Sequence, residues 1–489
     1  DRLASDFERL MAKKKKGDGI TFAGMSSNEV TGSCYHIQFA GKQILLECGL
    51  YQASSNDYLD SYKINSKKFP FKPSEISYIF VEHCHIDHIG LLPRLIKEGF
   101  KGKIILTDKA ARIAEALLRN CAFIVADEAR ILSKRYNRDY SPLYTMDDVE
   151  RTLGFFYVYD QYNTVFRLDD NVSFQWFKNS HCLGAAQLQL ILKDEQRCKK
   201  ILYTSDIGAI NPVNHYLSQT EIPDCFNDYT IMESTYGSKQ RTSKKTRKFD
   251  KEHLKTAVET VFERNGSVII PCFSFSRTQE ILTVLYEIFG SDTKFKAPVV
   301  VDSMLSCEIS NIYSEILSGD NLKLWNKVTE WENVRFISDK AESDTCVADD
   351  QPKIVISSSG FCTNGRILKY LEKYIADENS MICLCGYCGD NPSYLAYRIK
   401  NYKDFKQLKI NHTVVENKAD CISLYTFSSH ANHDDLVKFG SSLKTEKLIL
   451  VHGSEESKLE LKEDLQKSIS KNDKSYKVLC SSKDMFLRL

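Results

Sequence analysis

No stretch of eighteen consecutive apolar residues occurs in this 489-residue sequence. A helix that crosses a bilayer needs roughly 20 such residues, so the sequence predicts no membrane-spanning segment. The first sixteen residues, DRLASDFERLMAKKKK, are charged throughout and lack the apolar core of a secretory signal peptide. We expect them to form a short amphipathic helix with a solvated lysine tether, and we expect a cytoplasmic protein.

The sequence also has almost no excess of charge of either sign. Its 66 Lys and Arg balance 65 Asp and Glu, which leaves a net charge of +1. A global attraction to nucleic acid is therefore excluded, and any contact with phosphates must come from a local patch. The segment from Lys239 to Lys255 (KQRTSKKTRKFDKEHLK) is such a patch. Its two interpretations are a non-specific phosphate contact in a nucleic-acid channel and a solvated loop with a helix start.

A disulfide framework is not expected, although the sequence contains 16 cysteines. They are scattered, and many lie inside predicted strands or beside motifs, so we interpret them as reduced, buried small hydrophobes. Cys385 and Cys388 form a C-x-x-C pair, but no second pair follows at zinc-finger spacing. The length suits two or three domains rather than one.

Three histidines and an aspartate fall within six positions, His83 to His88 (HCHIDH). The preceding residues 76–81 are β-branched and aromatic, which predicts a buried strand. Residues 89–97 predict a helix start with Pro93 in its first turn. The sequence therefore predicts a ligand-bearing loop between a strand and a helix.

The spacing within this motif divides the donors into two groups. His83 and His85 alternate, so both can face one side of an extended backbone. Asp87 and His88 follow where the chain turns, and they can face a second point a few ångströms away. Imidazole and carboxylate donors together are typical of zinc ligation, so a metal site is predicted here.

The motif H-x-H-x-D-H after a hydrophobic strand resembles the signature of the metallo-β-lactamase superfamily. Two later segments resemble further motifs of that family. Ser180-His181-Cys182-Leu183-Gly184-Ala185 resembles Gly-His-x-Leu-Gly-Ala, and Asp206 ends a strand where a carboxylate can bridge two cations. Glu47-Cys48-Gly49 occupies the place of the family's Asp-Cys-Gly, with the longer acid.

The second half of the chain resembles the β-CASP group, the nucleic-acid-processing members of this superfamily. Glu233-Ser234-Thr235-Tyr236-Gly237 resembles the first β-CASP motif. The later motifs follow in order: PCFSFSRTQE from Pro271, VDSM from Val301, SSSGF from Ser357, FSSHAN from Phe427 and VHGS from Val451. Besides Glu47 and Ser180, the chain departs from the family pattern at Met304, Phe361 and Asn432, none of which removes a ligand.

The resemblance implies the fold class, an α/β protein with an αβ/βα metallo-β-lactamase sandwich and an inserted α/β β-CASP domain. Alternating apolar runs and amphipathic helices independently predict repeated β-α units and a mainly parallel sheet in the inserted part. We place the first part of the sandwich at 1–237, the inserted domain at 238–402 and the return segment at 403–489.

Local signals predict further elements of the first part. Gly41-Lys42 predicts a hairpin turn, and the polar residues 53–70 predict a loop. Residues 108–135 predict a helix with one apolar face, and Thr145 can cap a helix over 146–153.

The resemblance also implies two zinc ions, with Mn²⁺ as a substitute. One ion is held by His83, His85 and His181, and the other by Asp87, His88 and His452. Asp206 bridges them together with a hydroxide, the expected nucleophile, because zinc lowers the pKa of bound water to about 7. We assign catalytic roles to Asp87, Glu233 and His430, the last two as a paired acid that protonates the leaving oxygen or as support for the ligands.

Substrate phosphates are expected to contact the inserted domain. Ser276 and Arg277 begin a predicted helix after a strand, and helix starts bind anions. Ser358, Ser359 and Gly360 form a similar loop at a strand end. For both loops the alternative is a capping turn.

The function predicted from these residues is a zinc-dependent ribonuclease, acting as an endonuclease, a 5′ exonuclease or both. A histidine at the last motif, His452, resembles the RNA-cleaving members, among them bacterial RNA-processing ribonucleases and the endonuclease subunit of the cleavage and polyadenylation specificity factor. The alternatives are a DNA nuclease of the Artemis-like repair branch and a small-molecule metallo-hydrolase. We expect an RNA substrate, no membrane, and a homodimer or protein partner that supplies specificity, together with the insertions at 53–70 and 108–150.

Overall fold

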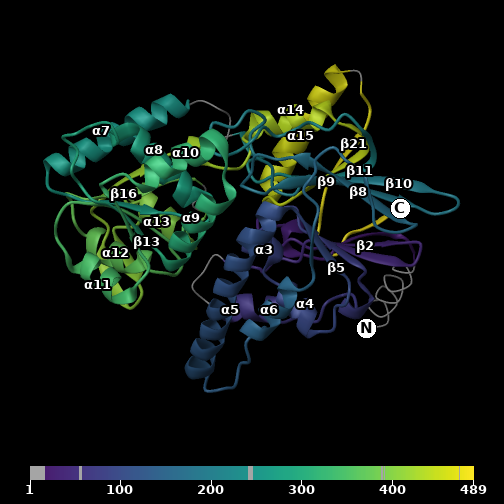
Figure 1. Ribbon diagram of the computed structural model, residues 1–489, viewed down its shortest axis with the longest axis horizontal. Coiled ribbons are helices and arrows are strands. Elements are labelled where there is room, and N and C mark those ends of the chain that lie inside the picture. Colours follow the sequence, from purple (N-terminus) through teal and green to yellow (C-terminus); the bar gives the residue numbers. More distant parts are fainter. Residues whose placement is uncertain (1–16, 54–57, 240–245, 387–388, 390, 473) are drawn as a thin grey trace.

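The computed structural model describes residues 17–53, 58–239, 246–386, 389, 391–472 and 474–489. The predicted N-terminal helix, residues 240–245 of the basic segment and Cys388 lie outside the described residues. The chain forms two lobes, with the segments at both ends of the sequence in one lobe and the middle of the sequence in the other (Figure 1). None of the described helices is long and apolar enough to cross a membrane.

Two seven-stranded sheets form the first lobe. The first sheet has the order β22-β1-β2-β3-β4-β5-β6. Its strands are β1 (Gly19–Phe22), β2 (Tyr35–Phe39), β3 (Lys42–Leu46), β4 (Tyr78–Phe80), β5 (Lys103–Leu106), β6 (Phe156–Val158) and β22 (Phe486–Arg488). The predicted hairpin around Gly41 is confirmed, because β2 and β3 pair antiparallel with Ile37 opposite Ile44.

The second sheet has the order β21-β20-β11-β10-β9-β8-β7. Its strands are β7 (Phe166–Arg167), β8 (Val172–Lys178), β9 (Ala186–Lys193), β10 (Cys198–Tyr203), β11 (Phe226–Glu233), β20 (Lys444–Val451) and β21 (Lys477–Cys480). Alternation along β8 buries Val172, Phe174 and Trp176, and these side chains fill the core between the two sheets.

Helices cover the outer faces of both sheets, which completes the predicted αβ/βα sandwich. α3 (Ile86–Ile89), α4 (Leu92–Lys97), α5 (Asp108–Tyr136) and α6 (Met146–Leu153) accompany the first sheet, and α14 (His433–Ser442) and α15 (Glu455–Lys471) cover the second. The predicted helix cap is present, because Thr145 forms a capping box with Asp148 at the start of α6.

The structure corrects two local predictions in this lobe. Residues 53–70 were expected to be a loop, but α2 (Tyr58–Asn65) occupies their middle. Its last residue exchanges two 2.8 Å hydrogen bonds with the backbone of Tyr51, a tertiary contact that the polar sequence does not announce. The metal motif was expected to lie wholly on a loop, but Asp87 and His88 belong to the single turn of α3.

The second lobe is built on a six-stranded sheet with the order β14-β13-β15-β12-β16-β19. Its strands, all parallel as predicted, are β12 (Val268–Pro271), β13 (Val299–Asp302), β14 (Val334–Ile337), β15 (Ile354–Ser357), β16 (Met381–Leu384) and β19 (Asp420–Ser423). β19 lies beyond residue 402, the predicted end of the inserted domain, so the sheet extends further along the chain than this boundary. A separate hairpin pairs β17 (Gln407–Ile410) with β18 (Thr413–Glu416).

Helices cover both faces of this third sheet. α7 (Arg247–Glu263), α8 (Arg277–Phe289), α9 (Met304–Ile316) and α10 (Gly319–Thr329) pack on one face, and α11 (Lys340–Ala348), α12 (Ile367–Tyr374) and α13 (Leu395–Lys400) on the other. The apolar core of the first face continues into the first lobe through α5 and α9. The two lobes therefore share buried contacts rather than only a linker.

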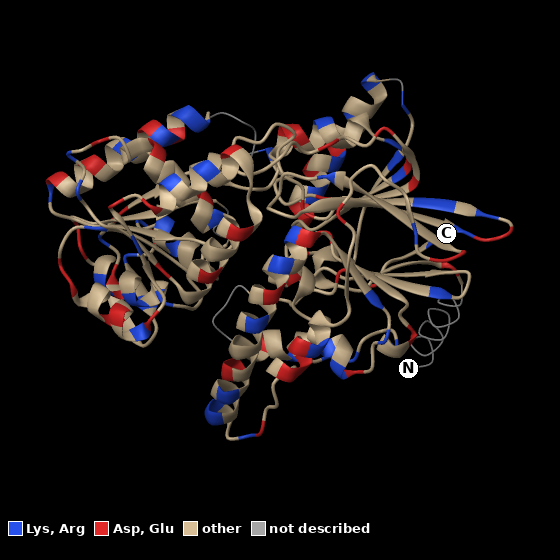
Figure 2. Ribbon diagram, in the orientation of Figure 1, with Lys and Arg blue, Asp and Glu red and all other residues tan. Residues whose placement is uncertain are grey.

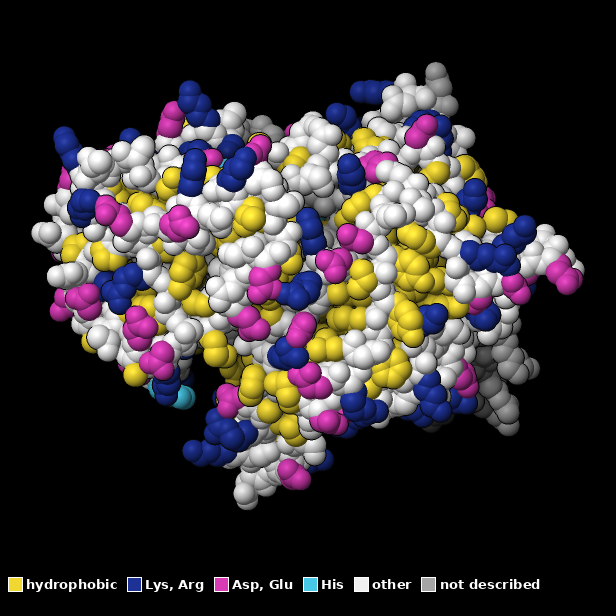
Figure 3. Space-filling view, viewed as in Figure 1, with side chains coloured by type: hydrophobic (Ala, Val, Ile, Leu, Met, Phe, Trp, Pro, Cys, Tyr) yellow, Lys and Arg dark blue, Asp and Glu magenta, His cyan; other side chains and the backbone are white. Residues whose placement is uncertain are grey.

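Charged residues of both signs are interspersed along the ribbon of both lobes (Figure 2). The face drawn in Figure 3 shows the same mixture, with apolar side chains between the charges. This distribution agrees with the near-zero net charge. Any contact with a charged ligand must therefore come from a local group of residues.

Candidate metal centre

All seven metal ligands predicted from the sequence meet at one edge of the sandwich. Because β3, β4 and β5 run parallel to one another, as do β10, β11 and β20, the carboxyl ends of strands from both sheets reach this edge. The residues brought together are His83, His85, Asp87, His88, His181, Asp206 and His452. Segments more than 350 positions apart in the sequence thus supply one site, since His452 Nε2 lies 3.5 Å from Asp87 Oδ2.

These side chains fall into the two groups that the family resemblance implies. His83, His85 and His181 form one group, and Asp87, His88, Asp206 and His452 form the other, with one donor atom of each residue within 4.8 Å of the others in its group. Asp206 lies between the groups.

The distances from the Asp206 carboxylate show this position. Its Oδ2 atom is 3.2 Å from His88 Nε2 and 3.7 Å from both His83 Nε2 and His181 Nε2. A carboxylate within 4 Å of donor atoms from both groups is placed to bridge two cations.

The bonding state of these atoms tests whether a metal fits. Among the described residues, the buried Nε2 atoms of His83 and His88 and the buried Oδ1 of Asp206 have no hydrogen-bond partner. Buried polar atoms in proteins are nearly always satisfied, and unsatisfied imidazole and carboxylate atoms that converge on one point are the donor set of zinc. The residues therefore fit a divalent metal centre.

The protonation of the ligands agrees with this fit. Burial lowers the pKa of His83 and His181 and brings that of His85 to about 4, so these three imidazoles are neutral and offer a lone pair at pH 7. Burial would also lower the pKa of His88, but the carboxylates of Glu47, Asp87 and Asp206 outweigh it and raise that pKa. A cation at His88 must therefore displace a proton.

Glu47, the acid that departs from the family pattern, orients two of the histidine ligands through hydrogen bonds on the side away from the metal centre. It is fully buried, and its Oε2 atom lies 2.5 Å from His88 Nδ1 and accepts from the Tyr203 hydroxyl at 2.7 Å. Its Oε1 accepts from Ser205 Oγ at 2.7 Å, and that hydroxyl lies 2.9 Å from His83 Nδ1. With its Nδ1 atom occupied in this way, each ring presents Nε2 to the metal centre. The longer acid thus still reaches both rings, one directly and one through Ser205.

The predicted acid pair lies beside the metal ligands. His430 Nδ1 is 3.0 and 3.2 Å from the two oxygens of Glu233, and His430 Nε2 is 4.0 Å from Asp206 Oδ2. Glu233 is fully buried and accepts from the backbone N–H groups of Ile207 and Thr235 at 2.7 and 3.1 Å. Burial alone would lower the pKa of His430, but the Glu233 carboxylate outweighs it and raises this pKa.

The predicted substrate-binding loops of the second lobe face the metal centre. Because β12 and β15 pair in parallel, the loops after them lie side by side. The Phe275 ring is 5.2 Å from the His85 ring, which places the start of α8 against the metal ligands. Arg277 is 8% exposed, and its Nη1 atom has no hydrogen-bond partner among the described residues.

Two serine hydroxyls that sequence reasoning missed lie next to the predicted Ser358. Ser303 Oγ lies 3.0 Å from Ser358 Oγ and 3.3 Å from Ser274 Oγ. Both Ser274 and Ser303 belong to recognised motifs, and their positions at strand ends are the signal that marks them. The Ser359 hydroxyl accepts a hydrogen bond within its own loop from Thr363 N at 3.1 Å, and its contact with substrate stays a prediction.

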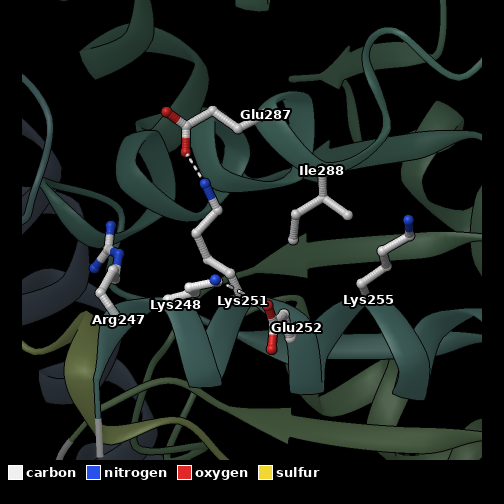
Figure 4. A pocket seen from close by; sticks show the side chains of 7 residues that line it. All are labelled: Arg247, Lys248, Lys251, Glu252, Lys255, Glu287 and Ile288. Atoms are coloured by element: carbon white, nitrogen blue, oxygen red, sulfur yellow. Dashed lines mark hydrogen bonds and ion pairs between the residues drawn. The ribbon is translucent and has the colours of Figure 1, made fainter.

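The described part of the basic segment forms a shallow groove with α8. A hollow of about 420 Å³ is lined by Arg247, Lys248, Lys251, Glu252, Lys255, Glu287 and Ile288 (Figure 4). Lys251 is paired with Glu287 at 2.6 Å, and Arg247 is bound to Glu280. Among the residues that the structure describes, Lys248 and Lys255 pair only at long distances, 4.0 and 3.9 Å, with acids one turn along the helix. A phosphate contact here stays a prediction that depends on these two lysines.

Comparison with known proteins matches three family models along the chain. The metallo-beta-lactamase superfamily model matches residues 28–147, the Beta-Casp domain model matches 278–392, and the Zn-dependent metallo-hydrolase RNA specificity domain model matches 415–475. The last description and the His/Asp clusters together support metal binding.

Several curated proteins are similar over most of the chain. Integrator complex subunit 11 of Danio rerio is 25% identical over 459 residues, which cover 91% of this chain and 71% of that protein. Ribonuclease TTHA0252 of Thermus thermophilus is 27% identical over 445 residues, which cover 89% and 93%. Endoribonuclease YSH1 of Eremothecium gossypii is 24% identical over 471 residues, which cover 91% of this chain and 56% of that protein.

Among solved structures, a protein of unknown function from Enterococcus faecalis V583 superposes with a TM-score of 0.49 at 12% identity, over 96% of this chain and 100% of that one. That likeness is too distant to carry an argument. The three family models, matched in order over both lobes, carry the assignment instead: the chain belongs to the β-CASP group of the metallo-β-lactamase superfamily.

Proposed function

We propose that this protein is a zinc-dependent ribonuclease that hydrolyses RNA phosphodiester bonds in RNA processing or degradation. The observation that carries the proposal is the His430–Glu233 pair, 3.0 Å apart, beside two donor groups that share Asp206. Relatives whose names are ribonuclease and endoribonuclease support the choice of reaction.

The ligand sets follow the two donor groups. His83, His85 and His181 would hold one cation, and Asp87, His88 and His452 the other, with Asp206 between them. Two bound zinc ions would supply neutralisation of charge on the phosphate oxygens and activation of the attacking water. The protein's own side chains supply the remaining steps.

The leaving oxygen needs a proton, and His430 is placed to give it. Glu233 occupies Nδ1 of His430 and favours the charged ring, so the Nε2–H points toward the metal ligands, 4.0 Å from Asp206. A protonated imidazole can transfer this proton to the departing 3′ oxygen as the P–O bond breaks. Glu233 is itself fixed by two backbone N–H groups, so it orients the ring without reorganisation.

Arg277 would hold the phosphate chain. Its Nη1 atom, which has no hydrogen-bond partner within the described ranges, is buried at the start of α8, on the side of the second lobe that contacts His85 through Phe275. A guanidinium N–H group that has no partner among the described residues is a ready hydrogen-bond donor to a phosphate oxygen. Ser276, Ser358, Ser359 and Gly360 would shape the loops around it.

The test is cleavage of end-labelled single-stranded RNA and of matched single- and double-stranded DNA, with zinc or with manganese. The controls are the chelated protein, Asp87→Ala and His430→Ala. Cleavage of RNA that all three controls abolish supports the proposal, and the product ladder distinguishes endonuclease from 5′ exonuclease action. Cleavage of DNA alone would show that the substrate assignment is wrong.

Specificity would come in part from other subunits. One relative is named as a subunit of the Integrator complex. We propose a homodimer or a protein partner for this chain too, which light scattering and co-purification of the intact protein would detect.

A further inference from the structure

Phe273 is an exposed aromatic side chain in a loop that is otherwise buried. It lies two residues after β12 and is 39% exposed, whereas its neighbours Cys272, Ser274 and Phe275 are buried. A single exposed phenylalanine is ordinary on a protein surface. Its surroundings distinguish this one.

The Phe273 ring is held in place by two further aromatic rings. Phe361 meets it edge-on, with ring centroids 5.1 Å apart and planes at 88°, and Tyr394 lies 5.6 Å beyond Phe361. Gly360 allows the close packing, because a Cβ at that position would come within 3.0 Å of a Phe273 ring carbon. The exposed ring is therefore preorganised rather than free to turn.

The backbone of Phe273 is tied to the start of α8. Its carbonyl oxygen accepts from Thr278 N at 3.2 Å and from Thr278 Oγ1 at 2.7 Å. The residue before Thr278 is Arg277, whose Nη1 atom has no partner in the described part of the chain, and Phe275 contacts the metal ligand His85. The exposed ring thus lies on the same short loop as this guanidinium and the wall of the metal centre.

This combination matches the parts of a nucleotide. A phosphate needs a cation, and the base attached to the same sugar needs a flat apolar surface a few ångströms away. Every base offers a π-face, so a phenylalanine ring accepts any of them, provided that the base is not already stacked inside a duplex.

We propose that Phe273, braced by Phe361 and Tyr394, is a stacking platform for one unpaired nucleobase of the RNA beside the cleaved phosphodiester. The inference rests on the proposed function and deepens it, because it makes single-stranded RNA the substrate class. Phe361 stands where the β-CASP motif has methionine, so the bracing ring is a feature of this chain.

Binding measurements on a protein that keeps its metal ligands test the platform. In the zinc-loaded His430→Ala protein, fluorescence anisotropy gives the Kd for a short single-stranded RNA and for versions with one abasic site moved along the strand. One abasic position should weaken binding about 5- to 100-fold, the range of a stacked base. Phe273→Leu should weaken binding of the intact RNA to the same extent. In this variant the same abasic site should not weaken binding further.

Matched variants separate stacking from general disturbance. Phe273→Trp should keep the affinity, and Phe361→Met should give a smaller loss. Phe226→Leu, at a 53% exposed phenylalanine on the first strand residue of β11, should leave the Kd unchanged. Thermal unfolding of each variant shows whether the fold is kept.

The outcomes distinguish the platform from the function. Suppose that the wild-type protein cleaves RNA. If Phe273→Leu then leaves the Kd for RNA unchanged, or if an abasic site still weakens binding to this variant, the platform is overturned and the ribonuclease proposal stands. If RNA neither binds nor is cleaved, both are overturned. Equal affinity for duplex and single strands would also overturn the platform.

Discussion

Glu47 is the residue through which the two sheets of the sandwich reach the metal ligands. It follows β3 in the first sheet, and it binds Tyr203 and Ser205 at the end of β10 in the second. Its contacts with His88 and, through Ser205, with His83 touch one ligand of each donor group. One buried carboxylate thereby fixes two imidazole rings.

Replacing Glu47 by Gln should weaken metal binding more than it changes the fold. The amide keeps the shape but loses the negative charge that holds a proton on His88 Nδ1, and such changes typically cost about 10- to 100-fold in metal affinity. Competition with a chromogenic zinc chelator measures this. Glu75→Gln, an exposed acid paired with Lys72, is the control and should bind zinc like the wild type. Unchanged zinc affinity in Glu47→Gln would contradict the role given to this contact.

The role of His430 as a proton donor makes a prediction about leaving groups. His430→Ala should lower kcat on RNA by about 10²- to 10⁴-fold, the usual contribution of a general acid. The same change should have little effect on bis(p-nitrophenyl) phosphate, because a nitrophenolate departs without a proton. A steady-state comparison of the two substrates checks this. An equal loss on both would mean that His430 only supports the metal ligands.

At the scale of elements, a loop of the first lobe binds α8 of the second. His215 Nδ1 lies 3.0 Å from Glu280 and its Nε2 lies 2.6 Å from Glu287. The Tyr216 hydroxyl lies 2.8 Å from the Thr283 hydroxyl, one turn of α8 further along. These contacts hold the helix that begins with Arg277 against the lobe that carries the metal ligands.

His215 should make stability depend on pH. Burial opposes its charge, but Glu280 and Glu287 raise its pKa from 6.5 to about 9. A raised histidine pKa stabilises the fold fully below pH 6.5, and this contribution is lost as pH rises to 9. The free energy of unfolding should therefore fall by about 2 kcal/mol over this window, less than the full shift allows because the ring is partly exposed. In His215→Gln, urea titrations should show this fall removed; an undiminished fall would contradict the assignment.

The two unengaged lysines of α7 make the phosphate prediction testable. If Lys248 and Lys255 contact RNA, Lys248→Gln with Lys255→Gln should lower the slope of log Kd against log salt by about 0.7 for each contact with a single strand. A matched double variant on α10, Lys323→Gln with Lys327→Gln, should leave the slope unchanged. An unchanged slope in the α7 variant would show that the segment is a solvated helix start.

Sequence alone predicted the elements whose patterns are local. The amphipathic stripe of α5, the Thr145 cap and the parallel strands of the inserted domain are confirmed. The helix α2 was missed because it is held by hydrogen bonds between Asn65 and the backbone of Tyr51. Such contacts between distant polar residues leave no periodic pattern in the sequence. Ser303 was missed for the same reason, since its importance depends on Ser274 and Ser358 from two other strands.

At the scale of the whole molecule, the described metal ligands come only from the first lobe. The segment after β4 supplies four of them from the first sheet, and the segments after β8, β10 and β20 supply His181, Asp206 and His452 from the second. Bound metal would therefore join the two sheets of one lobe, while the third sheet has a separate core on one of its faces.

Removal of metal should consequently loosen one lobe more than the other. Ligands that bind only the folded state stabilise it by about 4 kcal/mol at 1,000 times Kd, and this term should be lost from the sandwich alone. Hydrogen exchange with and without chelator should show faster exchange in β3–β5 and β8–β11, and little change in β12–β15, where no ligand originates. In Asp87→Ala, which lacks one ligand, the chelator should have less effect. An equal rise of the exchange rate in all three sheets would mean that the two lobes unfold as one unit. The shared core between α5 and α9 would then couple the lobes more strongly than the metal stabilises the sandwich.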